Sequence, residues 1–192
     1  MEKKVLTEDL VTKIKEILSS NENKDSLFAG FKKDSKKCLI YPTDDIHLSK
    51  EQFLALTRAI NEKSYYVMQL EEINQIFSTG NCIFEISSYD DYERVYDEYE
   101  KNIEEFRANG HSDFNMYYFW SKTLLFSDSL DWILQITECL DGGIGILGGN
   151  PEKVNRFMEV YGRCEEEYSE CIKDHKERNL PLVLNEISNI LS

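Results

Sequence analysis

Apolar and polar positions along the chain follow helical periods in some segments and strand periods in others. Near the start, apolar residues recur every three or four positions from Leu10 to Leu18, which predicts an amphipathic helix. Thr7 stands where a capping oxygen is needed, and acidic residues follow it in the first turn. The next stretch, 19–37, is polar and rich in lysine. We therefore expect 1–37 to form a helix and a Lys-rich loop that is semi-independent of the body.

The middle of the chain predicts several strands and one more capped helix. Ser49 and Gln52 match a capping box, which opens a helix that runs to about Asn61. A two-strand hairpin is expected around the turn residues Asp141-Gly142-Gly143. Runs of apolar, β-branched and aromatic residues predict strands over 38–41, 65–68, 82–86, 114–126, 132–137 and 144–147, with a buried helix as the alternative for 114–126.

The segment after residue 88 carries the most regular pattern in the chain. Ser88 and Asp91 match a second capping box, and the following residues predict a helix that ends near Gly110. One arc of this helix is apolar and aromatic: Tyr92, Val95, Tyr96, Tyr99, Ile103 and Phe106. Beside it lies a second arc, spaced by four, three and four residues and containing no basic side chain: Glu93, Asp97, Glu100 and Glu104.

A long helix is predicted near the C-terminus. Asn150 suits its N-cap and Pro151 its first turn, and Pro181 ends it before a short last helix over 182–191. One stripe along it is apolar at alternating spacings of three and four: Val154, Phe157, Tyr161, Cys164, Tyr168 and Cys171. This stripe packs on the body in one interpretation, and joins a second copy through the 151–174 helix in another.

The order of these elements favours one fold class. Strands gather in the middle and helices at both ends, and the alternation of a doubly wound parallel sheet is not sustained. We expect a single α+β domain over 1–192, with a mostly antiparallel sheet of about five or six strands, covered on one side and helical at both termini.

The charge of the chain limits the classes of partner that such a domain can bind. The chain has 22 basic and 36 acidic residues, a formal charge of −14, and 41% hydrophobic residues. Residues 1–37 hold nine Lys and seven Asp or Glu, so the remaining residues carry −16. Such a surface repels nucleic acid and anionic membrane, and it attracts basic proteins. An acidic surface that only keeps the protein in solution is the plainer interpretation.

Cysteine use and the N-terminus indicate a compartment. There are five cysteines, an odd number, without a C-x-x-C spacing, which argues against a disulfide framework. The first twenty residues lack the apolar core of a signal peptide, and no uncharged stretch is long enough to span a bilayer. We therefore expect a soluble protein of the cytoplasm.

Two motifs resemble ligand sites. Gly143, Gly145 and Gly148 match the spacing of a dinucleotide fingerprint, yet the residues between them alternate as in a short strand, so turns around a strand are expected. Cys164, Cys171 and His175 share a helical face and suit zinc, with a fourth ligand from His47 or His111. Small cysteines on a core stripe explain the same pattern. We predict neither a cofactor nor a metal.

Catalytic groups are sparse. His111, Ser112 and Asp113 are adjacent, which does not make a triad, because a triad requires convergence in space. Glu85 and Glu138 lie in apolar strand runs and would serve as an acid–base pair only if buried together. The usual placement is the solvent face of a strand. We therefore predict a protein that is not an enzyme.

The acidic helix gives the most specific functional hypothesis. Residues 88–107 hold eight acidic and three basic residues, and like charges at such spacing destabilise a helix slightly. Their presence is explained if Glu93, Asp97, Glu100 and Glu104 bind a basic partner, with Tyr96 and Tyr99 as anchors. A second acidic run, Glu165-Glu166-Glu167 with Glu170, would extend this surface.

In composition the chain is similar to bacterial toxin-immunity proteins as a broad class. That similarity carries no site residues, but it implies an inhibitor that covers a basic protein. The alternatives are a small cytoplasmic enzyme with a carboxylate and histidine cleft, and a structural oligomerisation module.

Overall fold

The protein is built on a seven-stranded antiparallel sheet. The structure is a computed structural model that describes residues 1–20, 26–41, 47–70, 73–95, 97, 122–138 and 143–192. The strand order is β1-β6-β5-β7-β8-β9-β4, and β2 and β3 form a separate pair. The bounds are β1 Glu2–Val5, β2 Leu18–Ser19, β3 Gly30–Phe31, β4 Lys36–Ile40, β5 Tyr65–Leu70, β6 Cys82–Ile86, β7 Lys122–Ser127, β8 Trp132–Glu138 and β9 Gly143–Gly149.

This architecture confirms the predicted α+β class, with a larger sheet than expected. The strand of this sheet that the sequence patterns missed is β1, a charged tetrapeptide that pairs with β6 at the sheet edge. The short strands β2 and β3, within the expected helix end and Lys-rich loop, were not predicted either. The expectation of a helix at both termini holds at the C-terminus but was wrong at the N-terminus, where β1 precedes the predicted helix, α1 Glu8–Ile17. Thr7 caps α1 as expected, accepting a hydrogen bond from the Leu10 amide at 3.4 Å.

Both faces of the sheet are covered, so the expectation of a one-sided cover was wrong. On β5, Val67 contributes to the core on one face and Met68 to the core on the other. On β7, Leu125 and Leu124 divide in the same way. The central strands are apolar at nearly every position because neither face of them meets water.

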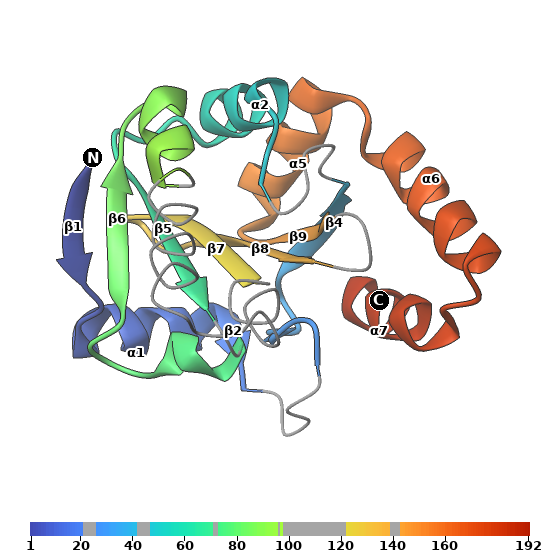
Figure 1. Cartoon of the computed structure of the whole chain (residues 1–192), viewed down its shortest axis with the longest axis horizontal. Coiled ribbons are helices and arrows are strands. Elements are labelled where there is room, and N and C mark those ends of the chain that lie inside the picture. The colour runs from blue at the N-terminus through green and yellow to red at the C-terminus, as the bar shows by residue number, and fades with distance from the viewer. Residues whose placement is uncertain (21–25, 42–46, 71–72, 96, 98–121, 139–142) are drawn as a thin grey trace, which may run out of the picture.

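The first face carries the largest core. It is covered by α2, Lys50–Ile60, by α5, Pro151–Tyr161, and by helical residues 89–95 (Figure 1). Phe53 of α2 stacks on Tyr92, with ring centroids 5.1 Å apart. Trp132 is fully buried beneath them and donates its indole N–H to Ser127 at 2.8 Å.

The second face is covered by α1 and by a short 3-10 helix, η1 Ile73–Phe77 (Figure 1). The buried face of α1 presents Val11, Ile14 and Ile17 to residues of β5 to β8. The apolar spacing that predicts this helix thus also predicts which side of it packs.

Two further helices close the β4 edge. They are α6, Cys164–Glu177, and α7, Pro181–Leu191, and both lie at that end of the sheet in Figure 1. The prediction of one helix from Asn150 to Pro181 was wrong, because the first helix ends at Gly162 and a second one begins at Cys164. This residue has a φ of 69°, in the left-handed region that favours glycine, and caps α5 through a hydrogen bond to the Met158 carbonyl.

Local capping signals were otherwise reliable. Ser49 and Gln52 form both hydrogen bonds of the predicted capping box. Asn150 caps α5 through the Glu152 amide at 2.9 Å. The second predicted box is half formed: Ser88 accepts from the Asp91 amide at 3.2 Å, whereas the Asp91 carboxylate binds Ser87.

The glycine-rich segment is a strand, β9, as its alternation predicted. It pairs with β8 on one side and β4 on the other. A methyl group at Gly148 would overlap the ring of Phe31, so glycine lets this ring pack directly against the β9 backbone. Within the predicted strand 114–126, β7 begins at Lys122. Residues 114–121 and most of the predicted hairpin turn lie outside the described residues.

Candidate functional site

The acidic helix that follows β6 presents two carboxylates to solvent. Tyr92 and Val95 face the core and are 3% and 1% exposed, as their arc predicts. Glu93 and Asp97 lie off that arc and are exposed. The other predicted members of the surface, Tyr96, Tyr99, Glu100 and Glu104, lie outside the described residues.

Two described cations near this helix are directed to a different carboxylate, that of Asp91. The N-terminal ammonium lies 3.2 Å from Asp91, and the Arg94 guanidinium lies 3.8 Å from it. Burial would raise the pKa of Asp91, but hydrogen bonds from Ser87 and the N-terminus outweigh this effect and lower the pKa. Within the described part of the chain, no ion pair reaches Glu93 or Asp97.

The other ion pairs of the described residues also involve carboxylates other than Glu93 and Asp97. They join Lys4 to Glu85, Lys13 to Asp9, Lys153 to Glu62 and Asp131, Arg163 to Glu166, and Arg178 to Asp174. The described cations that form ion pairs therefore bind carboxylates at other places in the fold. Glu93 and Asp97 form no ion pair with any described cation.

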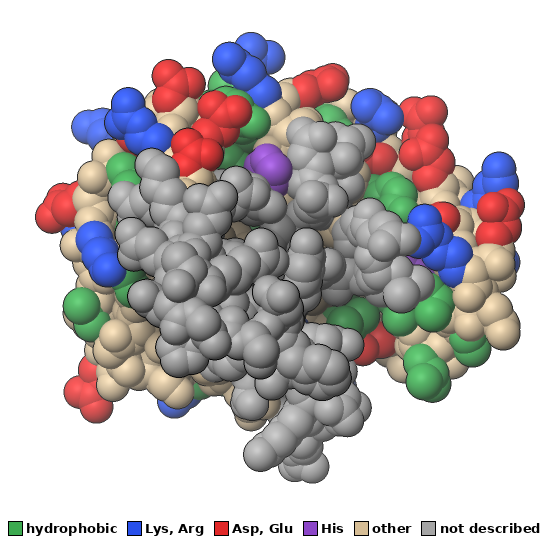
Figure 2. Space-filling model, viewed as in Figure 1, with side chains coloured by type: hydrophobic (Ala, Val, Ile, Leu, Met, Phe, Trp, Pro, Cys, Tyr) green, Lys and Arg blue, Asp and Glu red, His purple; other side chains and the backbone are tan. Residues whose placement is uncertain are grey.

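The second acidic run, on α6, does not form one continuous surface. Glu165, Glu166 and Glu170 are exposed, whereas Glu167 is 2% exposed and belongs to the buried side of the helix. The expectation that Glu167 extends an outer acidic surface was wrong, because it shares a helical face with Cys164 and Cys171. Figure 2 shows basic and acidic side chains mixed over the part of the surface that carries α6.

Glu167 instead fastens α6 to the body. Its carboxylate accepts from the Tyr41 amide at 3.0 Å, from the Gln52 side chain at 3.3 Å and from the Tyr161 hydroxyl. Burial, followed by the hydrogen bond to Glu167, raises the pKa of Tyr161. These donors come from β4's end, α2 and α5, so one buried carboxylate joins three elements. Sequence reasoning missed it because the contacts span up to 126 residues.

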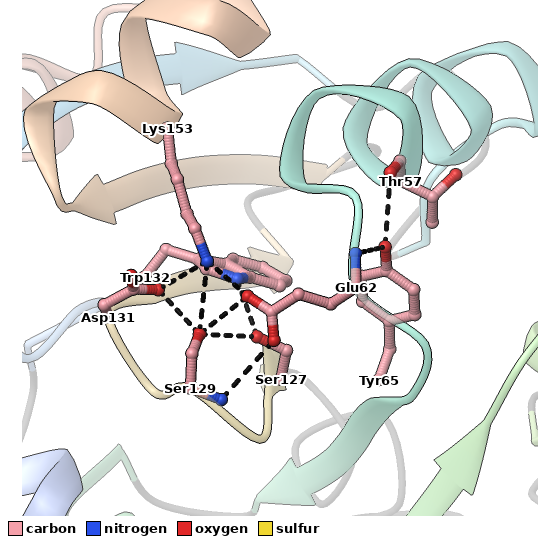
Figure 3. Close-up of polar contacts among 8 residues, drawn as sticks. All are labelled: Thr57, Glu62, Tyr65, Ser127, Ser129, Asp131, Trp132 and Lys153. Carbon is pink, nitrogen blue, oxygen red and sulfur yellow. Dashed lines mark hydrogen bonds and ion pairs between the residues drawn. The ribbon is translucent and has the colours of Figure 1, made fainter.

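A second polar cluster joins α2, the β7–β8 turn and α5 (Figure 3). The Lys153 ammonium contacts Glu62, lies 2.9 Å from Asp131 and donates to Ser129 at 3.3 Å. Burial would lower the pKa of Lys153, but its hydrogen bonds to the two carboxylates outweigh this and raise the pKa. A lysine held as a cation cannot act as a general base, so this cluster has the chemistry of a structural link.

The hypothetical acid–base pair is not formed. Glu85 lies on β6 and Glu138 on β8, and two further strands, β5 and β7, separate them in the sheet. Three inter-strand steps amount to about 14 Å. Lys4 binds Glu85, and this hydrogen bond is the main cause that lowers the pKa of Glu85. His111, Ser112 and Asp113 lie outside the described residues.

No metal site emerges from the described residues. No group of three or more His, Cys, Asp or Glu side chains among them could hold a metal ion. Of the three zinc ligands that the sequence suggested, two lie together: Cys171 Sγ is 3.6 Å from His175 Nδ1. The third, Cys164, packs in a different core cluster from Cys171. A cavity of about 10 Å³ next to His47 has room for about one water molecule.

The apolar stripe proposed for oligomerisation packs mostly against the rest of this chain. Five of its six members are buried within this chain, and Tyr168 alone is exposed, at 39%. No helix of the described residues is both long and apolar enough to cross a bilayer.

Comparisons with protein families, with curated proteins and with solved structures found no match for this chain. The functional argument therefore depends on the molecule's own charges and contacts.

Proposed function

We propose that this protein binds a basic protein partner through an acidic surface on the helix that follows β6. The surface comprises Glu93 and Asp97 together with the residues predicted from the same helical pattern: Tyr96, Tyr99, Glu100 and Glu104. It would work by electrostatic steering, in which unpaired carboxylates speed association with a cationic surface and aromatic rings supply affinity.

The observation that carries this proposal is the distribution of the chain's ion pairs. The described cations that form ion pairs bind Asp91 and carboxylates elsewhere in the fold, and they leave Glu93 and Asp97 exposed without an ion pair. The net charge of −14 adds a long-range field of the same sign.

Among basic proteins, we propose a toxin as the partner and an inhibitory role for this chain. The support is the compositional similarity to bacterial toxin-immunity proteins. An inhibitor of this kind places carboxylates where an enzyme would bind the phosphates of its substrate. A toxin-like reading frame beside the gene would identify the protein to test.

The test compares two variants of equal charge. In the first, Glu93, Asp97, Glu100 and Glu104 become Gln or Asn. In the matched control, four exposed acids of α5 and α6 become Gln: Glu152, Glu159, Glu165 and Glu170. The association rate constant with the candidate basic protein is measured by stopped flow at 20 and 300 mM NaCl.

We expect the first variant to associate at least about tenfold more slowly than the control at low salt, because steering depends on charge near the contact. The difference should shrink at 300 mM NaCl. Equal slowing by both variants would mean that net charge alone matters, and unchanged rates in both would exclude the acidic helix as the binding surface.

A further inference from the structure

A small cavity lies between the first face of the sheet and helical residues 89–95. Its volume is about 10 Å³, which is room for about one water molecule. The described residues around it have polar and apolar side chains: His47, Gln69, Tyr92, Thr123, Val67 and Val95. Among these residues none is acidic, so they offer no negative charge that would hold a cation. The cavity therefore suits a small neutral ligand.

Gln69 and Thr123 line the cavity on the side of the sheet. They are directly opposite each other in the antiparallel pairing of β5 with β7. The side chains of such a pair leave the sheet on the same face, with their Cβ atoms about 5 Å apart. Thr123 is 3% exposed and therefore belongs to the interior. An amide and a hydroxyl group thus approach the cavity from two neighbouring strands.

The Gln69 side chain supplies a hydrogen-bond acceptor that needs a donor. Its carbonyl oxygen, Oε1, is buried and accepts no hydrogen bond from any residue that the structure describes. A buried acceptor without a donor has lost its hydration and gained nothing in return, which makes such an atom costly to the fold. Val67, the next residue on the same face of β5, has no side-chain group that could donate. A bound donor of the size of the cavity would remove this cost.

Tyr92, which lines the cavity on the side of the helix, is held in place by its own contacts. Its hydroxyl group accepts a hydrogen bond from the Leu48 amide at 2.9 Å. The ring centroids of His47 and Tyr92 lie 6.3 Å apart, and Phe53 stacks on Tyr92 with centroids 5.1 Å apart. Closing the cavity by moving Tyr92 onto Gln69 would break these contacts. The space beside Gln69 Oε1 is therefore a fixed feature of the packing.

We propose that the cavity binds one ordered water molecule between the sheet and the helix that follows β6. The water donates one hydrogen bond to Gln69 Oε1 and forms a second with the Thr123 hydroxyl group. The polar groups of His47 and Tyr92 complete its surroundings. An internal water needs about two to four polar partners, and a polar lining favours water over an empty cavity. The water gives β5 and β7 a polar link to the helix that carries Glu93.

The test counts long-lived internal waters in solution by oxygen-17 relaxation dispersion of the solvent, over a range of temperatures so that slowly exchanging waters are included. Gln69→Met keeps the length of the side chain and removes the acceptor. Gln75→Met is the matched control, because Gln75 is a half-buried glutamine of η1 that does not line the cavity. We expect Gln69→Met to hold one water fewer than the unsubstituted protein, and Gln75→Met to hold the same number. Equal numbers in all three proteins would overturn the proposal.

A crystal structure of the unsubstituted protein is a second readout, and it decides alone if Gln69→Met fails to fold. We expect electron density for one water within about 3.2 Å of both Gln69 Oε1 and Thr123 Oγ1. Three results would each contradict the proposal: a cavity without density for a water, a protein side chain in its place, or a Gln69 amide turned outward to solvent.

Discussion

Lys153 is the cation that two carboxylates share. Its ammonium contacts Glu62 and Asp131, and the side chains of Lys153 and Glu62 are 22% and 18% exposed. Removing the cation leaves two partly buried anions facing each other. We expect Lys153→Met to lower the free energy of unfolding by about 1–2 kcal/mol, between the values for exposed and fully buried pairs. Urea unfolding measures this change.

The matched control is Lys13→Met. Lys13 pairs with Asp9 on the surface of α1, where the two side chains are 45% and 75% exposed. Solvent and salt screen such a pair, so the loss should stay below about 0.5 kcal/mol. Equal losses in the two variants would show that the cluster around Lys153 contributes no more to the free energy of unfolding than a surface ion pair does.

The lowered pKa of Glu62 should make part of the free energy of unfolding depend on pH in the acidic range. Burial would raise the pKa of Glu62, but hydrogen bonds from Lys153 and Ser129 outweigh it and lower the pKa below the ordinary 4.5. A carboxyl with a lowered pKa stabilises the fold above pH 4.5, and this contribution is lost as the pH falls through the folded-state pKa. The unfolding free energies of the native protein and Glu62→Gln should therefore differ at pH 6 and converge as the pH falls from 4.5 through the folded-state pKa of Glu62. A constant difference would contradict the assignment.

At the scale of single elements, α6 depends on Glu167. In Glu167→Ala the Tyr41 amide and the Tyr161 hydroxyl lose their acceptor, and unsatisfied buried donors cost about 1–3 kcal/mol each. We expect faster hydrogen exchange along α6 and at the Tyr41 amide. Glu165→Ala is the control, because Glu165 is exposed on the same helix. Unchanged exchange in Glu167→Ala would mean that apolar packing alone holds α6.

The packing of the Phe31 ring against β9 depends on Gly148. A methyl group there would overlap the ring of Phe31, so we expect Gly148→Ala to destabilise the protein by about 1–3 kcal/mol. Combining it with Phe31→Ala should recover part of that loss, because the smaller side chain vacates the space. A double-mutant cycle by urea unfolding measures the coupling. Additive losses would show that the two residues do not interact.

Elements with local signals could be predicted from the sequence. The caps at Thr7, Ser49 and Asn150 were predictable, since each needs only a side chain and an amide a few residues away. The apolar spacing from Val154 to Cys171 predicted which side of the segment packs. It did not predict that the helix ends at Gly162, because the apolar spacing continues across this glycine.

Features that depend on distant partners could not be predicted. The strand β1 has three charged residues in four, and its pairing with β6 places it in the sheet. The contacts of Glu62 with Lys153 and of Glu167 with Tyr41 join residues 91 and 126 positions apart. For the acidic helix, the pattern predicted the buried arc at Tyr92 and Val95, whereas the pairing of Asp91 with the N-terminus emerges only from the fold.

At the scale of the whole molecule, the charge of −14 opposes folding through self-repulsion. Screening by salt weakens this repulsion, whereas partly buried pairs such as Lys153 with Glu62 are screened much less. We therefore expect the thermal midpoint at pH 7 to rise by a few degrees between 20 and 300 mM NaCl. The same titration at pH 4.7, the isoelectric point, is the control, because there the net repulsion vanishes. A midpoint that falls with salt at pH 7 would mean that attractive surface pairs outweigh the repulsion. The exposed carboxylates would then already be compensated within the chain, and the proposed attraction of a basic partner would lose its physical basis.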